Sequence, residues 1–392
     1  MRPAVDPVPS RYVNVDEARR RFGDAADRLG GYFNAGDPLA DAAVEALSAL
    51  PTAQREALVE RCLREGAGDD APEALRALLA ACERVPFWVD FDRCDRGGAM
   101  FLRTGLVGGL ILGSYSLTAG YLSPAGNKPL SFSGRLTEQA PRRLAETGRF
   151  VEQVSLKGGM RPRAEGWRIT VRVRLMHASV RRMLLRSPKW DAGAWGVPIN
   201  QADSAGTILL FSLVVLDGLD KLGYPTTREE RDDLLHLWRW VAYVIGVEDD
   251  LRFATEPEAR RFWDLLATTQ GPPDDDARAL AKALHDSPIT AARTPAERAR
   301  AVRMRSVGYA LSRYFLGDAY ADALGYPRTP AVHALALMRR INRRAGTLWR
   351  ALPAVPIGSE AVGARYWRFV VEQGLRGVPA TFSMPEGLAR EA

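Results

Sequence analysis

Hydrophobic residues recur every three or four positions over most of this chain, the spacing of one face of an α-helix. The clearest example lies within residues 167–186, where the apolar positions are Ile169, Val173, Met176, Val180, Met183 and Leu184. The alternation of apolar and polar residues that marks a strand occurs only in short stretches. The pattern therefore predicts an all-α protein with one core.

Glycine and proline divide this pattern into further helices. Residues 38–84 predict two or three short helices with a loop at 66–72, and Asp92 or Asp95 is expected to cap a helix that continues to Leu112. Other helices are expected at 137–154, 167–186, 204–222, from the capping-box pair Thr227 and Glu230 to about 246, at 299–316 and at 329–349.

An apolar extended linker at 85–90 separates the first helices from the rest of the chain. We therefore expect residues 1–84 to be an N-terminal helical extension packed on the core, 85–350 to be the core, and 351–392 to be a C-terminal tail. A length of 392 residues fits one large domain or two packed ones.

Residues 104–127 carry no charge, which is also a property of membrane spans. Six glycines, several hydroxyl groups and Pro124 make this stretch only mildly apolar, so a buried helix followed by a loop is the better interpretation. No stable membrane insertion is expected. No apolar stretch of signal-peptide length is visible near the start, which favours a cytoplasmic protein.

The net charge of +7 is not a nucleic-acid signal here. The chain has five lysines against 49 arginines, and the arginines are scattered among 47 acidic residues instead of forming one stripe. We therefore expect no nucleic-acid partner. The three cysteines form no CxxC pair, which excludes the usual zinc and disulfide patterns and favours a reducing compartment.

Several familiar active sites are absent from the sequence: it contains no GxGxxG after a strand, no phosphate loop and no GxSxG. The four histidines form no HExxH pair. His285 and His333 are expected in polar or helix-surface surroundings, and His236 near the start of a helix. A non-haem metal would thus need ligands from distant segments.

His177 differs from the other histidines because it lies on an apolar helix face. Val173, Val180 and Leu184 are at offsets of minus four, plus three and plus seven from it. The helix therefore carries an imidazole into the interior. A histidine that only satisfies its own hydrogen bonds inside the core also fits this pattern.

Two arginines flank this histidine on one side of the helix, Arg174 three residues before it and Arg181 four residues after it. Burying them is costly unless anions meet them. A haem supplies both partners, because its iron binds a neutral imidazole and its propionates bind guanidinium groups. The alternative is a solvated helix edge with ordinary ion pairs.

Six segments of the chain resemble the family of rubber oxygenases (latex-clearing proteins) and mycophenolate-pathway oxygenases. These segments are Pro86–Asp90, Arg96-Gly97, Gly134–Leu136, Arg143–Thr147, Val173–Arg181 and Asn200-Gln201. The resemblance covers roughly residues 85–350, and 174–182 is its most specific part. It implies a globin-like helical core with additional terminal helices, and haem b with His177 as the proximal iron ligand.

The resemblance also implies that Arg143 and Thr147 lie near the distal face of the haem. Their spacing of four residues puts both on one helix face, although a plain helix surface with an Arg143–Glu146 pair fits as well. Rubber-cleaving members carry a lysine between these positions, where this chain has Glu146. Residues 123–133 also lack the acid that those members use as a base. Both departures argue against rubber cleavage by that mechanism.

The sequence thus predicts a haem b oxygenase that uses dioxygen on an apolar small molecule, such as an isoprenoid, a polyene or a secondary-metabolite intermediate. The expected cofactor-binding residues are His177, Arg174 and Arg181, and the expected catalytic residues are Arg143, Glu146 and Thr147. Glu146 would accept a proton or hold a water, or else face solvent. A peroxidase-like enzyme and a non-catalytic protein that binds hydrophobic ligands are the alternatives.

An apolar substrate would need an apolar wall. Candidate wall residues, which fit the core equally well, are Leu210, Phe211, Trp238 and Tyr243. The sequence indicates neither the electron donor nor the oligomeric state.

Overall fold

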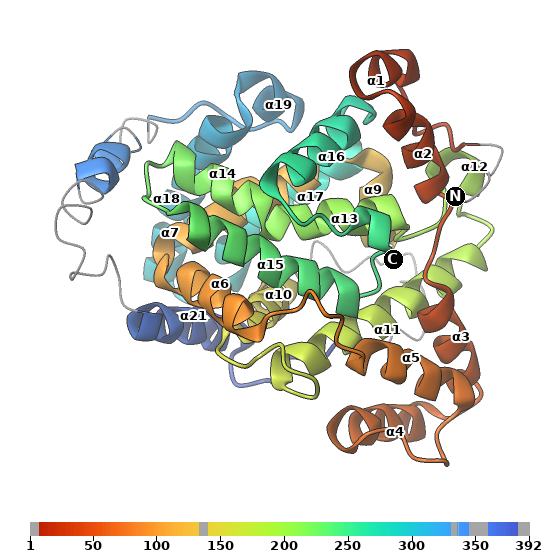
Figure 1. Ribbon diagram of the computed structural model, residues 1–392. Helices are drawn as coiled ribbons and strands as arrows, with labels where there is room; N and C mark the ends of the chain where they lie inside the picture. Colours follow the sequence, from red (N-terminus) through yellow and green to blue (C-terminus); the bar gives the residue numbers. More distant parts are fainter. Residues whose placement is uncertain (1–7, 133–139, 331–334, 336, 345–359, 383–392) are drawn as a thin grey trace.

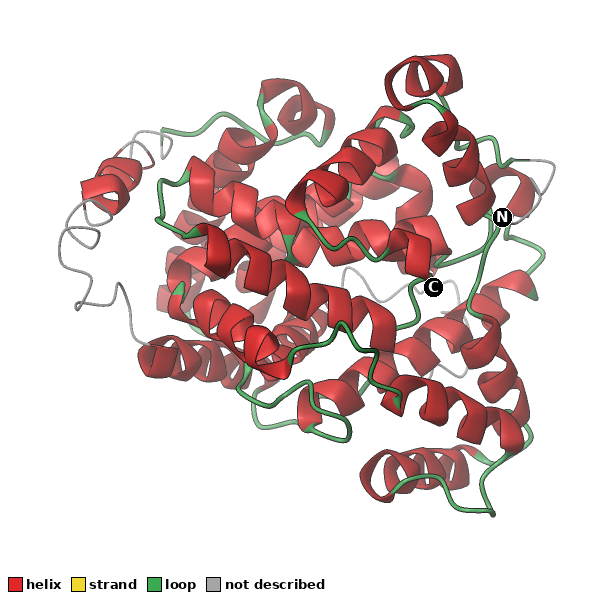
Figure 2. Cartoon of the chain, in the orientation of Figure 1, coloured by secondary structure: helices red, strands yellow, loops and turns green. Residues whose placement is uncertain are grey.

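The computed structural model describes residues 8–132, 140–330, 335, 337–344 and 360–382. These residues form helices joined by loops, and no strand occurs among them (Figure 2). The all-α prediction is therefore confirmed.

The first half of the chain contains ten α-helices and one π-helical turn within the described residues. They are α1 (Val15–Phe22), α2 (Asp24–Tyr32), α3 (Pro38–Leu47), α4 (Thr52–Glu65), α5 (Glu73–Glu83), α6 (Phe91–Arg103), α7 (Leu106–Ile111), η1 (Leu112–Ser116), α8 (Leu117–Gly120), α9 (Pro124–Phe132) and α10 (Ala140–Ser155).

The second half of the chain begins with α11, a long helix near the middle of the sequence (Figure 1). Its elements are α11 (Glu165–Leu185), α12 (Ala192–Trp195), α13 (Gln201–Phe211), α14 (Leu213–Lys221), α15 (Arg228–Val244), η2 (Asp249–Leu251), α16 (Glu256–Thr268), α17 (Asp275–Ala291), α18 (Pro295–Leu316), α19 (Asp318–Ala323) and α21 (Glu360–Leu375). Residues 337–344 are also helical.

Helix α6 lies between α15 and α10 because two glycines let both neighbours approach its backbone. A Cβ at Gly97 would lie 2.3 Å from the carbonyl oxygen of Asp233, and one at Gly98 would lie 2.2 Å from that of Ser155. Any larger residue would push these helices apart. The Arg96-Gly97 segment of the family resemblance is therefore explained by helix packing.

The start of α6 differs from the expectation. Asp90 is the N-cap, and its carboxylate accepts hydrogen bonds from the backbone nitrogens of Asp92 at 2.9 Å and Arg93 at 3.2 Å. The prediction that Asp92 or Asp95 caps this helix is wrong. A residue that is already helical cannot cap the first free N–H groups, so the cap belongs one residue before the helix.

The end of α6 also differs, because the helix stops at Arg103 instead of continuing to Leu112. Gly105 has a φ of +49°, a conformation that favours glycine, and the chain bends by 85° there before α7 begins. Residues 204–222 are similarly divided at Ser212, whose hydroxyl donates to the carbonyl of Ile208 at 2.9 Å.

Other expected helices are confirmed. Helix α11 occupies the place predicted for residues 167–186, and α15 begins with the reciprocal capping box of Thr227 and Glu230. Part of the helix expected at 329–349 falls outside the described residues, as do Gly134–Leu136 and His333.

Both terminal segments contribute to the main core. Apolar residues of α1 to α5 belong to the same buried cluster as those of α11 and α15. Near the C-terminus, Trp367 of α21 is 4% exposed and packs on Phe101 of α6, with ring centroids 5.1 Å apart. The segment expected to be a tail therefore includes a packed helix, while the division of the chain into domains stays a prediction.

Among the described residues, the stretch Gln201–Lys221 is long and apolar enough to cross a membrane by length and composition. It comprises α13 and α14, and 72% of its most apolar window is buried inside the protein. The core helices of folded proteins pass the same test, so this stretch is explained by its central position. Residues 106–120 also pack inside the molecule, as α7, η1 and α8.

Candidate functional site

His177 lies in the middle of α11. Protein atoms surround its ring, yet the residue keeps some accessible surface. Burial and, to a smaller extent, the positive charge of Arg181 lower the pKa of His177 to about 4. The imidazole is therefore neutral at pH 7, the form that binds a metal.

The other two described histidines are also buried, but their rings have partners. Nε2 of His236 accepts a hydrogen bond from the backbone nitrogen of Asp90 at 3.0 Å, and Nε2 of His285 lies 3.1 Å from the hydroxyl of Ser312. The expectation of polar or surface surroundings for His285 is wrong, because this residue is 7% exposed. Neither ring nitrogen of His177 has a hydrogen bond to another described residue.

Arg174, one turn before His177, is held by an ion pair with the N-terminal segment. Its side chain is 7% exposed, and Nε and Nη2 donate to the two carboxylate oxygens of Asp37 at 2.7 and 2.9 Å. Nη1 donates to the carbonyl of Val244 at 3.1 Å. The anion that burial of this arginine requires is therefore Asp37, and its predicted contact with a propionate stays a prediction.

Arg181, one turn after His177, is less fully satisfied. Nη1 donates to Asp41 at 2.6 Å and Nη2 to the carbonyl of Ile199 at 3.1 Å. Nε is buried and has no hydrogen-bond partner among the described residues. Of the two flanking arginines, this one keeps a donor for another group.

The side chain of Gln201 holds the connection between α2 and α3 against the segment that follows α15. The side-chain amide of Gln201 donates to the carbonyls of Gly36 at 2.9 Å and Gly246 at 3.0 Å, and its oxygen accepts from the backbone nitrogen of Glu248 at 2.9 Å. Gly246 has a φ of +94°, and a Cβ there would lie 2.4 Å from the Asp37 carboxylate. No residue other than glycine leaves room for the ion pair.

Sequence reasoning missed Asp37, Asp41 and this use of Gln201. Their partners are separated from them by 45 to 165 positions in the chain, and no local periodicity connects such distant residues. The sequence did indicate that buried arginines near His177 must meet anions. It suggested haem propionates as these anions, whereas the structure shows that Asp37 and Asp41 are partners of the two arginines.

Arg143 and Thr147 lie one turn apart on α10, on the helix face that also carries the buried Phe150. The charge of Arg143 acts on His177, where it contributes to the lowered pKa. The same charge acts on Tyr121. Burial raises the pKa of Tyr121 to about 12, and the positive charge of Arg143 opposes this rise. The charge of Arg143 therefore reaches His177, while its place near the distal face of a haem stays a prediction.

Glu146 faces another part of the molecule. Its carboxylate accepts from Nε of Arg142 at 3.1 Å and from the backbone nitrogen of Thr381 at 3.3 Å. Arg142 is thus a partner of Glu146, whereas the sequence suggested a pair of Arg143 with Glu146. Glu146 therefore ties α10 to the segment after α21.

The aromatic residues proposed as a substrate wall separate into two groups. Phe211 stacks on Trp238 with ring centroids 4.9 Å apart, and Phe150 meets both rings edge-on. Tyr243 instead stacks on Trp240, and its hydroxyl donates to the carbonyl of Ala81. Phe211 and Phe150 extend the apolar surroundings of α10, whereas Tyr243 belongs to a different part of the core.

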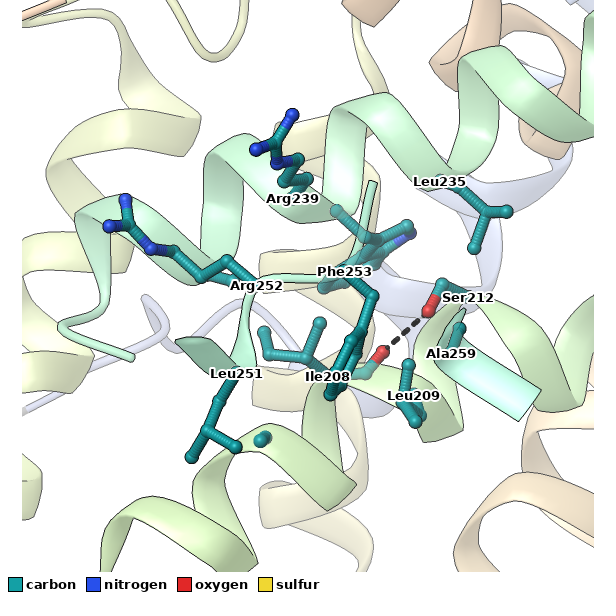
Figure 3. A pocket seen from close by; sticks show the side chains of 12 residues that line it. Ile208, Leu209, Ser212, Leu235, Arg239, Leu251, Arg252, Phe253 and Ala259 are labelled. Atoms are coloured by element: carbon teal, nitrogen blue, oxygen red, sulfur yellow. Dashed lines mark hydrogen bonds between the residues drawn. The ribbon is translucent and has the colours of Figure 1, made fainter. Parts of the chain in front are cut away.

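A surface pocket lies between α13, α15 and α16 (Figure 3). It encloses about 10 Å³, room for a single water molecule. Figure 3 shows the guanidinium groups of Arg239 and Arg252 turned away from Ile208 and Leu209 at its floor. His177 does not line this pocket, which is too small for an apolar substrate.

Comparison with known proteins agrees with the resemblance read from the motifs. Residues 93–351 match the family described as "ER-bound oxygenase mpaB/B'/Rubber oxygenase, catalytic domain". The rubber oxygenase of Streptomyces sp. (strain K30) is 27% identical over 304 residues, which cover 73% of this chain and 69% of the relative.

The fold has a counterpart among solved structures. The structure of latex clearing protein LCP in the closed state matches with a TM-score of 0.60 at 21% identity, covering 92% of this chain and 93% of the other. This likeness shows a shared all-α fold. With two thirds of its residues matched by the family, the chain belongs to the mpaB and rubber oxygenase family.

Proposed function

We propose that this protein is a haem b-dependent oxygenase that acts with dioxygen on an apolar small molecule, with His177 as the proximal ligand of the iron. One observation carries the proposal. His177 is enclosed by protein, neutral at pH 7, bordered by accessible space, and without a hydrogen bond from its ring to any described residue. A metal bond at one ring nitrogen would satisfy it.

The residues around His177 fit a haem better than an iron site built from side chains. No three His, Cys, Asp or Glu side chains gather into a metal-binding group within the described ranges. An iron at His177 therefore needs most of its ligands from a macrocycle. The free Nε of Arg181 fits a propionate carboxylate in the same neighbourhood.

Bound haem would supply the binding and activation of dioxygen, and the chain supplies the surroundings. The guanidinium of Arg143 and the hydroxyl of Thr147 share one face of α10 and offer hydrogen bonds to a polar group on that side. Phe150 and Phe211 add apolar surface, which excludes water and favours an apolar substrate. Glu146, held by Arg142 and Thr381, stabilises this helix from its other side.

The relatives of this chain are oxygenases by name, which supports an oxygenase, and the name of one of them gives rubber as its substrate. The family lysine that Glu146 replaces, and the missing acid in residues 123–133, favour a small apolar substrate over the polymer. This choice of substrate is part of the proposal.

The absorption spectrum of the protein purified from haem-replete cells tests the proposal. We expect a Soret band, and we expect the reduced protein to bind carbon monoxide because Glu146 stands in place of the lysine that binds the iron in rubber-cleaving members. His177→Ala should lose the band, whereas His236→Gln, which alters a buried histidine with its own partner, should keep it.

The outcomes separate the alternatives. A colourless wild-type protein, or a His177→Ala variant that keeps an unchanged spectrum, would reject the proposed cofactor site. Oxygen uptake in the presence of an apolar substrate is expected, and turnover that requires peroxide and ignores dioxygen would identify a peroxidase-like enzyme instead.

A further inference from the structure

The helix formed by residues 337–344 packs on the body of the protein through one face only. Met338 packs against the main hydrophobic cluster, and the side-chain amide of Asn342 donates to the carbonyl of Leu222 at 3.0 Å. The stem of Arg343 lies close to Gly223, where a Cβ would meet it at 2.9 Å. This face therefore fixes the orientation of the helix.

The opposite face is exposed and unusually apolar for a protein surface. Leu337 is 59% exposed and Ile341 is 57% exposed, and exposed Arg340 and Arg344 lie beside them. These four residues are spaced by three, one and three positions, so they form one stripe along the helix. Figure 1 shows the helix, in blue between two grey stretches, at the left edge of the molecule.

The charge of this region is one-sided. Residues 323–359 contain six arginines and no aspartate or glutamate. Arg339, Arg340 and Arg344 form no ion pair with any described residue. Some exposed arginines elsewhere in the chain do have acidic partners, for example Arg64 with Glu60 and Arg76 with Asp69 at 3.2 Å.

We propose that the stripe of Leu337, Arg340, Ile341 and Arg344 binds the surface of an anionic phospholipid bilayer. In this arrangement the aliphatic side chains enter the boundary between headgroups and acyl chains, and the guanidinium groups bind lipid phosphates. Nucleic acid requires the arginines but leaves the two exposed aliphatic side chains without a role. An acidic lipid surface uses both kinds of residue on the same face.

The binding is peripheral and reversible. The exposed face is too short to span a bilayer, and its contribution comes from a few residues. Each basic residue near an anionic surface raises the partition coefficient about fivefold, so Arg340 and Arg344 together contribute about thirtyfold. Salt weakens the attraction by screening it.

Sedimentation with large unilamellar vesicles tests the proposal on the full chain, and it requires neither haem nor turnover. We expect the protein to sediment with vesicles of equal parts phosphatidylcholine and phosphatidylglycerol, and to stay in solution with phosphatidylcholine alone. High salt should release it. A protein that ignores the anionic vesicles, or binds both kinds equally, would overturn the proposal.

Two pairs of variants locate the contact. Arg340→Gln with Arg344→Gln should lower the partition coefficient about thirtyfold. The matched control, Arg64→Gln with Arg76→Gln, removes the same charge from exposed positions on α4 and α5 and should change it less than threefold. Equal losses in both variants would indicate a general charge effect and reject this helix as the contact.

The aliphatic positions provide the second pair. Leu337→Ser with Ile341→Ser should weaken binding about tenfold, because less apolar surface enters the membrane. Val85→Ser with Phe87→Ser changes another exposed apolar pair, far along the chain from this helix, and should have little effect. A double-stranded DNA competitor that removes the protein from vesicles, combined with no effect of the serine variants, would assign the arginines to nucleic acid. Circular dichroism confirms that each variant is folded.

Discussion

His177 and His285 are both buried on helices, and burial lowers the pKa of each from 6.5 to about 4. Their surroundings differ. The ring of His285 lies near the hydroxyl of Ser312 and meets Tyr309 and Tyr326 edge-on at centroid distances of 4.9 and 5.0 Å. The ring of His177 has no such hydrogen bond to a described residue and borders accessible space.

This difference indicates which property distinguishes a histidine that binds a metal from a structural one. Burial and a lowered pKa are shared by both histidines, and they describe a structural histidine as well as a functional one. A missing partner distinguishes His177, because a buried polar group that no protein atom satisfies is costly unless something else binds it. We therefore expect His285 to act in stability and His177 in binding.

The largest expected effect concerns what holds the region of His177 in place. Asp37→Asn keeps the size of the side chain but leaves Arg174 buried without a full counter-charge, which should lower the free energy of unfolding by about 3 to 5 kcal/mol. Chemical denaturation of the haem-free protein measures it. A loss this large would show that the ion pair one turn away, not the imidazole, anchors α11.

Two further variants control this prediction. Asp69→Asn removes an exposed partner of Arg76 and should cost less than about 1 kcal/mol. Combining Asp37→Asn with Arg174→Met should recover much of the lost stability, because it removes the unpaired charge. If the double variant is no more stable than Asp37→Asn alone, the uncompensated arginine is not the cause.

Acid should destabilise the protein through both histidines. Between pH 6.5 and about 4 the unfolded chain takes up a proton at His285 that the folded chain does not, so the free energy of unfolding falls as the pH falls. The loss approaches about 3 kcal/mol for each such group and stops below the folded pKa, where both states are protonated. Chemical denaturation measured across this pH range should show the free energy of unfolding falling with pH.

The two regions should respond differently when haem is bound. His285→Gln should flatten the pH dependence with or without haem, since the ring contacts only protein. His177→Gln should flatten it in the haem-free protein, whereas in the haem-bound wild type a metal bond would keep the imidazole neutral. If His177 contributes equally to the pH dependence of the free energy of unfolding with and without haem, it is not the ligand of the iron.

At neutral pH the same two positions should differ in stability. His285→Ala removes a ring packed between two tyrosines and leaves the Ser312 hydroxyl without this partner, so we expect a cost of about 2 kcal/mol. His177→Ala in the haem-free protein should cost less than about 1 kcal/mol, because its ring already borders space. Equal costs would indicate that His177 is an ordinary core residue.

The local pattern of the sequence predicted those helices that are determined by residues close together in the chain. The apolar face of α11 and the capping box of Thr227 and Glu230 are such cases. The continuation of α6 to Leu112 failed because one glycine, Gly105, adopts a positive φ that the apolar pattern does not reveal. Element type was therefore more predictable than the position of bends.

The candidate site was predictable only in part, and for a comparable reason. The position of His177 follows from helical periodicity, so sequence could identify it. Asp37 and Gln201 act across large sequence separations, and only the fold brings them to α11 and Gly246. His285 was misjudged because it has polar sequence neighbours, while its buried contacts come from α18 and from Tyr326.

The smallest effect concerns Glu146, a catalytic residue expected from the sequence whose carboxylate the structure pairs with Arg142. Glu146→Gln removes one partly exposed ion pair, so the free energy of unfolding should change by less than about 1 kcal/mol. Arg143→Gln removes a charge that acts on His177, so it should shift the Soret band or the carbon monoxide affinity, and Glu146→Gln should shift neither. If Glu146→Gln changes the haem spectrum as much as Arg143→Gln does, Glu146 acts at the haem site. Its pairing with Arg142 would then belong only to the haem-free protein.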